Sequence, residues 1–321
     1  MSISVKKALR IIVPFSLGIF LLIFIYNSSS PLDRKEIVAN ISHANLVCVS
    51  ISIIIGILSH ISRAIRWNYL LKPLGYSPKV SNNFFIVMMA YLANLGVPRS
   101  GEFLRATALA SYENIPFEKG FGTIVTERVV DVIMLLFIII AALLLQTNFV
   151  MGYLQDYGMG LAVSILVLAI GIIGLVVLLN LIKKAKNGFL LKLKQFLEGM
   201  LQGVSSILKM KHRGPFIVHT IFIWLCYIGM FWTIKFAVPG VESLGISELL
   251  VAFVAGAFAM MVFPGGIGGY PVFVSAALSL YGITSTAGDT FGWVMWIAQT
   301  LMILVFGAIS FILLPLLNRN R

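Results

Sequence analysis

The chain has 321 residues, of which 59% are hydrophobic and 11% are charged, and its formal net charge is +12. Soluble domains carry about 25% charged residues, so this composition excludes a water-soluble fold. The positive charges stand in the connections between apolar stretches rather than on a basic face studded with aromatic side chains, which argues against nucleic acid as a partner. The sequence therefore predicts an all-α integral membrane protein.

Six apolar stretches are predicted to cross the membrane as helices, which takes roughly 20 residues each. They are Ile11 to Tyr26, Leu46 to Ser62, Gly122 to Leu145, Gly160 to Ile182, Pro215 to Phe236 and Phe291 to Leu314. None alternates polar and apolar residues as an outer-membrane strand does. No cleavage site follows the first stretch, so we expect an uncleaved span there.

Two further apolar pieces are interrupted by proline and glycine. Phe84 to Val97 breaks at VPRSGE, and Leu249 to Phe263 breaks at FPGGIGG. Both pieces consist of a short apolar helix, a proline, a glycine-containing break and another short helix. Such interruptions at corresponding places of two halves point to the binding site of a transporter-like fold.

We therefore predict two re-entrant helical hairpins, at residues 84–111 and 247–281, inserted from opposite sides with their tips at Pro98 and Pro264. Residues 1–321 then form one transmembrane domain, an inverted repeat with halves 1–145 and 159–321. Backbone broken at membrane depth must be buried in protein or line a cavity. The alternative is eight or more full spans, because the second piece with its flanks approaches spanning length.

The distribution of lysine and arginine predicts the topology, since short cytoplasmic loops are enriched in both. Connections 63–83 and 183–214 are basic and are predicted to be cytoplasmic, whereas 27–45 and 146–158 are predicted to be external. Both termini are then cytoplasmic. Residues 188–211 fit an amphipathic helix on the anionic leaflet, with a solvated linker as an equal alternative.

Charged residues gather at the cytoplasmic ends of three predicted elements. The eight positions are Arg63, Arg66, Arg99, Glu102, Arg105, Glu127, Arg128 and Asp131. Five arginines against three acids leave an excess of two positive charges, so a buried cluster would favour an anion such as a phosphate group. For Arg63 and Trp67 the alternative is an interfacial anchor. Glu127 and Asp131 lie inside a span, where an acid needs a cavity or a partner.

The remaining polar or flexible residues give weaker signals. Gly265, Gly266 and Gly268 allow backbone amides to approach an anion, and close helix packing is the alternative. The two cysteines are interpreted as packing residues, and the four histidines are scattered and are assigned no chemistry. Because we find no catalytic or metal-binding motif, we expect no enzymatic activity, no metal and no cofactor.

Three ordered motifs resemble a known family. They are RAIRW, then N-x-x-x-P-R-x-G-E-x-x-R from Asn94 to Arg105, then ER-x-x-D from Glu127 to Asp131. Together they resemble the lysylphosphatidylglycerol synthase transmembrane, or flippase-like, family of UPF0104-type membrane proteins. In that family a glutamate commonly follows the glycine break, whereas Tyr270 and Pro271 stand here, so no role of that glutamate is carried over.

The resemblance implies a core with re-entrant helices and a function in moving lipids. Family members that make lysylphosphatidylglycerol carry a soluble synthase domain after the membrane part, and this chain stops at Arg321. We therefore expect a lipid flippase or lipid transporter of the bacterial inner membrane, acting on a phospholipid or polyprenyl-phosphate-linked lipid. Arg66, Arg99, Arg105 and Arg128 would contact the anionic headgroup, while Glu102, Glu127 and Asp131 would orient them or carry a proton.

The alternative is a non-transporting subunit or scaffold of an envelope-lipid synthesis complex. Association with synthesis partners, or with further copies of the chain, is compatible with either expectation. A scaffold would lack a headgroup-sized cavity at the charged motifs, which distinguishes it from a transporter.

Overall fold

The computed structural model describes residues 30–147, 180–184 and 210–319, together with isolated residues of the segments between and before them. It divides into two compact units. Unit 1 comprises Met1–Val125 and His212–Arg321, and unit 2 comprises Thr126–Lys211. The predicted spans Ile11 to Tyr26 and Gly160 to Ile182, and the predicted amphipathic helix, lie almost entirely outside the described residues.

The described residues are helical, and four of their helices are long and apolar enough to cross a membrane. These are α3 (Leu46–Leu71, extended by the 3-10 turn η1, Lys72–Leu74), α6 (Phe117–Leu145), α10 (Arg213–Ile234) and α13 (Ser285–Leu317). At about 1.5 Å per residue, α13 alone is longer than the hydrocarbon core is thick. The protein is therefore a multi-pass membrane protein, as the composition predicts.

Helix α3 is longer than its apolar stretch. The predicted span ended at Ser62, with 63–83 as a loop, but the helix continues to Leu71. SRAIRW keeps a helical spacing of polar and apolar residues, and its polar side chains find partners inside the bundle, so the helix does not end where the apolar run ends. The predicted boundary at Ser62 is therefore wrong, because Arg63 and Arg66 lie on the helix and not in the connection after it.

A second difference lies before α3. Residues Pro31–Ser42 form helix α2 in the predicted external connection. The hydroxyl of Ser30 accepts a hydrogen bond from the amide of Asp33, and the Asp33 carboxylate accepts one from the amide of Ser30. This reciprocal cap, followed by Pro31 at the first helical position, is a strong start signal for a helix.

Both interrupted pieces are helical hairpins. The first consists of α4 (Val80–Gly96) and α5 (Ser100–Glu113), and the second of α11 (Ile246–Val262), the 3-10 turn η2 (Pro264–Gly266) and α12 (Gly269–Ser279). In each hairpin the second helix folds back and packs on the first. Neither piece is one continuous helix, although their positions relative to a membrane stay a prediction.

The two breaks have the same backbone. Val97 and Phe263, which precede the prolines, are extended, as the proline ring requires. Arg99 (φ 63°, ψ 10°) and Gly265 (φ 60°, ψ 12°), which follow them, are both left-handed. A local geometry repeated this closely in two halves is the structural counterpart of the internal repeat in the sequence.

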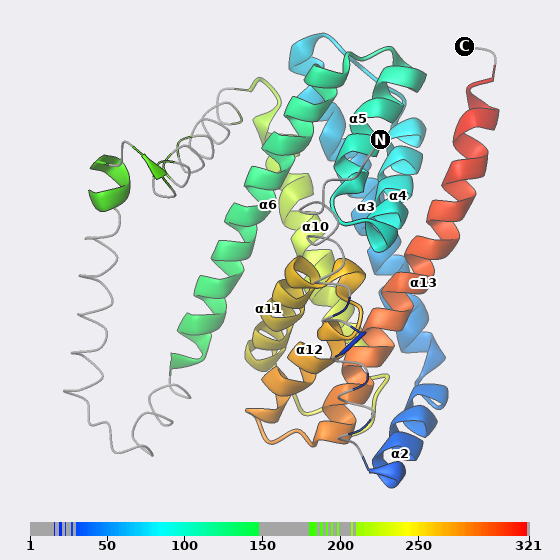
Figure 1. Ribbon diagram of the computed structural model, residues 1–321, viewed down its shortest axis with the longest axis vertical. Helices are drawn as coiled ribbons and strands as arrows, with labels where there is room; N and C mark the ends of the chain where they lie inside the picture. The colour runs from blue at the N-terminus through cyan, green and yellow to red at the C-terminus, as the bar shows by residue number, and fades with distance from the viewer. Residues whose placement is uncertain are drawn as a thin grey trace. The chain divides into compact units, whose positions relative to one another are not determined.

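The breaks also meet inside unit 1. A Cβ built on Gly265 would lie 3.0 Å from Leu95 Cδ2 and 3.6 Å from Leu95 Cα, two residues before Val97. In Figure 1 the α4/α5 hairpin occupies one end of the unit and the α11/α12 hairpin the other, so the tips face each other between them. Long helices α3 and α13 pack along the first hairpin, and α13 also packs on α12.

Candidate functional site

Helix α3 buries most of its polar side chains and exposes several of its apolar ones. Fully or almost fully buried on it are Ser52, Ser59, His60, Ser62, Arg63 and Arg66. On the opposite face Ile51, Ile54 and Leu58 are 41–55% exposed, as a helix in contact with lipid tails requires. A polar stripe facing inward along a membrane helix is characteristic of a functional site, because polar groups inside a bilayer are costly.

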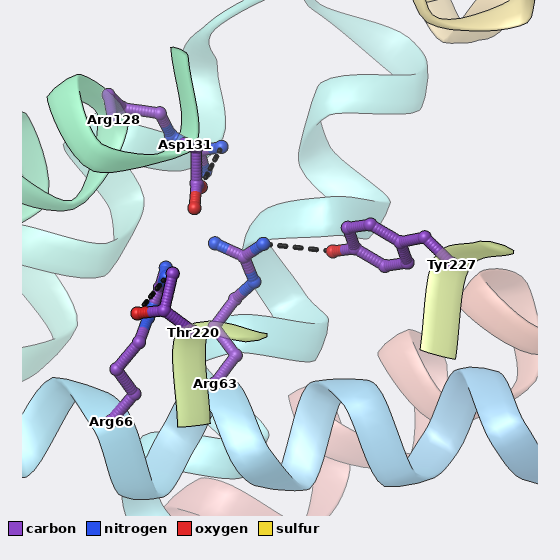
Figure 2. A network of polar contacts seen from close by, with 6 residues as sticks. All are labelled: Arg63, Arg66, Arg128, Asp131, Thr220 and Tyr227. Carbon is purple, nitrogen blue, oxygen red and sulfur yellow. Dashed lines mark hydrogen bonds and ion pairs between the residues drawn. The ribbon is translucent and has the colours of Figure 1, made fainter. Parts of the chain in front are cut away.

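The stripe packs on α10, which supplies hydrogen-bond acceptors. Arg63 Nη2 donates to the hydroxyl of Tyr227 at 2.8 Å, and Arg66 Nη1 donates to Thr220 Oγ1 at 3.2 Å (Figure 2). The Thr220 hydroxyl itself donates to the carbonyl of Phe216, which leaves its lone pairs for the arginine. Neutral oxygens of α10 thus help to orient two guanidinium groups.

A third arginine arrives from the first hairpin. Arg105 on α5 is 1% exposed, and its Cζ lies 4.0 Å from the ring centroid of Trp67, the residue after Arg66. The indole Nε1 of Trp67 donates to Thr123 Oγ1 at 2.9 Å, which fixes the plane of the ring. A cation over a desolvated indole is stabilised by about 2 kcal/mol. Three buried arginines therefore lie around this end of α3.

Trp67 is not an interfacial anchor. Its side chain is 0% exposed and packs in the core with neighbours from α4 and α5. Arg63 is 2% exposed and is equally enclosed. A side chain inside the helix bundle does not reach the headgroup region by snorkelling, so the alternative interpretation of these two residues as anchors is wrong.

The other charged residues of the first break have different environments. Arg99 is exposed, and Glu102 is half-buried in the first turn of α5. Arg99 is one of two non-glycine residues with positive φ among the described residues. This conformation costs an L-residue roughly 1–2 kcal/mol.

Glu127 and Asp131 of α6 belong to unit 2. Glu127 is 0% exposed, and Arg128 Nη1 lies 3.6 Å from Asp131 Oδ2 within the same helix (Figure 2). The side chains of Arg128 and Asp131 are 40% and 13% exposed, so this pair sits at the edge of the protein interior. The two units are described separately, and the prediction of one cluster joining these acids to the arginines of unit 1 stays a prediction.

At the second break, glycine permits close packing. A Cβ on Gly269 would collide with the ring of Phe263, and one on Gly266 would meet Tyr270 Cβ at 3.1 Å. The carbonyl of Gly265 accepts a hydrogen bond from Trp296 Nε1 at 2.8 Å, which ties the break to α13. These contacts account for Gly265, Gly266 and Gly269 by packing, and an anion site at this break stays a prediction.

Sequence reasoning missed the acceptors on α10. Thr220 and Tyr227 are seven residues apart, which is two helical turns, so they share one face of an apolar span. Polar residues at this spacing in a membrane helix are a readable signal for an inward face. Among the described residues, no three His, Cys, Asp or Glu side chains are grouped so that they could hold a metal ion.

Comparison with known proteins adds family information. The family model described as lysylphosphatidylglycerol synthase TM region matches residues 10–314. Over 134 residues the chain is 32% identical to the UPF0104 membrane protein MJ1595 of Methanocaldococcus jannaschii, covering 41% of this chain and 38% of that protein. Over 103 residues it is 29% identical to the glycosyltransferase AglD of Haloferax volcanii, covering 32% and 16% respectively.

The matched part is thus well under half the length of both relatives. No solved structure matches the chain.

Proposed function

The chain belongs to the family of the lysylphosphatidylglycerol synthase TM region, and from that premise we propose that it is a lipid flippase or lipid transporter. It moves a lipid with a phosphate headgroup between the leaflets while the tails stay in the bilayer. The observation that carries this proposal is the burial of Arg63, Arg66 and Arg105 inside a bundle of apolar helices.

Burial of arginine inside a membrane protein needs a functional reason. Each guanidinium loses its hydration at a cost of several kcal/mol, and ionisable groups inside membrane proteins usually mark functional sites. The guanidinium is planar and donates pairs of parallel hydrogen bonds, which matches the oxygens of a phosphate. Oriented by Tyr227, Thr220 and the ring of Trp67, the three groups suit an anionic headgroup.

The paired hairpins supply the second support. Transporters of the inverted-repeat type bind substrate where broken helices meet, and they alternate access by moving one repeat against the other. Here the breaks touch at Leu95 and Gly265, and Arg105 lies on the helix that follows the first break. A headgroup held by Arg105 would therefore be sensitive to the position of that hairpin.

The names of the family and of one relative are consistent with a function that involves lipids or glycoconjugates. The family description names a lysylphosphatidylglycerol synthase, and the Haloferax relative is named a glycosyltransferase. We assign transport rather than catalysis to this chain, because the buried groups described above are hydrogen-bond donors rather than a nucleophile with its base. The proposal places the protein in the cytoplasmic membrane, with both termini inside and an anionic lipid as its partner.

Reconstitution in vesicles tests the proposal. The purified chain should accelerate dithionite-resolved movement of tail-labelled phosphatidylglycerol at least tenfold over protein-free vesicles. Arg66→Ala and Arg105→Ala should abolish the acceleration. Because Arg66→Ala removes a buried hydrogen-bonded group, Arg66→Lys is the second variant. Lysine keeps the positive charge but lacks the planar pair of donors, so the rate of lipid movement should fall about tenfold in a folded protein.

The matched control is Arg319→Ala, which removes an exposed arginine and should leave the rate unchanged. Wild-type protein that moves no lipid, yet elutes as a folded species, would favour a non-transporting scaffold and overturn the proposal.

A further inference from the structure

Two buried side-chain nitrogens between α3, α4 and α13 make no hydrogen bond. His60 on α3 is 4% exposed, and its Nδ1 makes no hydrogen bond. Gln299 on α13 has a buried Nε2 that makes none either. The three helices pack on one another in unit 1.

Both side chains lie close to Gly56 of α3. Gln299 Oε1 lies 3.5 Å from the Cβ that Gly56 would carry, and Gly56 is one turn before His60 on the same face of α3. The ring of Tyr91 stands edge-on to the imidazole, with 4.6 Å between ring centroids. Met302, one turn after Gln299, lies against Gly56 as well. The absence of a side chain at Gly56 makes the room in which the amide sits.

Two orphaned polar groups at one place indicate an occupant. Each buried donor or acceptor without a partner costs about 1–3 kcal/mol, so native structures keep only a few of them. The amide nitrogen of Gln299 donates, while Nδ1 of His60 donates or accepts according to its tautomer. A hydroxyl group satisfies both, because it accepts and donates at once. The walls contributed by Tyr91 and Met302 suit the C–H faces of a polyol.

The position of these groups links them to the proposed transport path. Arg63 follows His60 by three residues on α3, so the guanidinium site begins one turn away. In the other direction, Tyr91 is one turn before Leu95, and Trp296 is one turn before Gln299. Leu95 touches Gly265, and Trp296 donates to its carbonyl. The pair therefore lies between the buried arginines and the meeting point of the two breaks.

We infer that His60 and Gln299 form an uncharged subsite that hydrogen-bonds the free hydroxyl groups of the headgroup, beside the arginines that take its phosphate. This assignment rests on the proposed function, which makes the ligand a lipid. It narrows the substrate class to phosphodiester lipids whose headgroup is a glycerol or a sugar. A headgroup with the same charge and no hydroxyl would leave both nitrogens unpaired.

The test compares two lipids of equal charge. Phosphatidylglycerol carries two free hydroxyls, and phosphatidylmethanol carries none. Binding is measured as the shift in thermal unfolding of the detergent-solubilised chain, and movement is measured in vesicles with tail-labelled forms. Wild type should prefer phosphatidylglycerol at least tenfold in apparent affinity, since a site built to bind a hydroxyl rejects the analogue that lacks it.

The variants are His60→Leu and Gln299→Leu. Each should reduce the preference to within about twofold while leaving the affinity for phosphatidylmethanol unchanged. Unfolding of the ligand-free variants should occur at the same temperature or higher, because the orphaned polar atoms are removed. The matched control is Thr290→Val, whose hydroxyl bonds to a carbonyl of its own helix, and it should keep the preference.

The outcomes separate this inference from the proposed function. The subsite is overturned if wild type binds both lipids equally, or if both variants keep the full preference for phosphatidylglycerol. A trapped water is then the partner of the two nitrogens. If wild type prefers phosphatidylglycerol and the variants lose this preference, but no lipid moves between leaflets, the transport function alone is overturned. Soluble glycerol phosphate should give no shift at concentrations where phosphatidylglycerol does, and a full shift would overturn the assignment to a lipid.

Discussion

The two breaks share a backbone and differ in chemistry. Both place an extended residue, a proline and a left-handed residue between two short helices, and α4 and α11 have 17 residues each. The first break carries Arg99 and continues into a helix with Glu102 and Arg105, whereas the second break and the helix after it use glycines and contribute no charge. One hairpin thus brings the charged side chains, and the other brings close-packed backbone.

The left-handed residue shows the difference most directly. Glycine adopts φ 60° at position 265 without cost, while arginine pays for φ 63° at position 99. A chain that keeps a strained arginine where its own repeat uses glycine indicates a use for that side chain. Arg99 is exposed at the break.

The largest expected effect concerns the opposite insertion of the hairpins. Ser111 and Ser279 are exposed near the ends of α5 and α12, and each is replaced by cysteine in a chain without Cys48 and Cys226. Ser111→Cys should react with an impermeant thiol reagent only from the cytoplasmic side, and Ser279→Cys only from outside. Labelling of both positions from the same side would contradict the predicted opposite insertion of the two hairpins.

A large effect on stability is also expected at the start of α5, the second helix of the first hairpin. Gly101→Ala places a methyl group against the carbonyl oxygen of Ala90, a backbone atom that cannot turn away. We expect destabilisation by about 1–3 kcal/mol or failure to accumulate, measured by thermal unfolding and size-exclusion chromatography. Gly96→Ala is the control, because nothing lies within 4 Å of its new methyl, and a similar loss there would refute the packing argument.

Substitutions at the two left-handed positions should change the stability of the protein in opposite directions. Gly265→Ala should cost about 1–2 kcal/mol from backbone strain, with the contact to Leu95 adding to it. Arg99→Gly should stabilise the folded protein by about 0.5–1 kcal/mol, since relief of strain exceeds the added flexibility of the unfolded chain. Lipid movement should fall in Arg99→Gly despite the gain. Unchanged movement would make the strain at Arg99 incidental.

The smallest expected effect concerns the tie between the second break and α13. Trp296→Phe removes the donor to the Gly265 carbonyl and should cost about 1 kcal/mol in unfolding free energy. Trp293→Phe is its control on the same helix. Equal losses in both variants would mean that the ring, and not the hydrogen bond, stabilises the break.

Much of the fold follows from local features of the sequence. The apolar stretches at α3, α6, α10 and α13 predict these four helices, and proline with glycine predicts both breaks. Boundaries were less readable. Helix α3 passes Ser62 because its polar residues bond to α10, and α2 was missed although Ser30, Pro31 and Asp33 form a helix start that the sequence displays.

The candidate site was predictable in part. The motifs single out Arg66 and Arg105, and both are buried, while their role in binding stays a prediction. Thr220, Tyr227 and Gln299 lie in other apolar stretches, and no local pattern connects them to the arginines. Hydrogen bonds between residues more than 150 positions apart depend on how helices pair.

The sequence by itself determined that the chain spans a membrane, where it breaks and which charges it carries, because hydropathy, proline and glycine act within a few residues of themselves. The tertiary structure decided which of those charges are enclosed. Arg63 and Arg66 turn inward because α10 packs on that face of α3, and Arg105 joins them because the break folds α5 back along α4. A helix has many faces available to an arginine, and only the packing of its neighbours selects one.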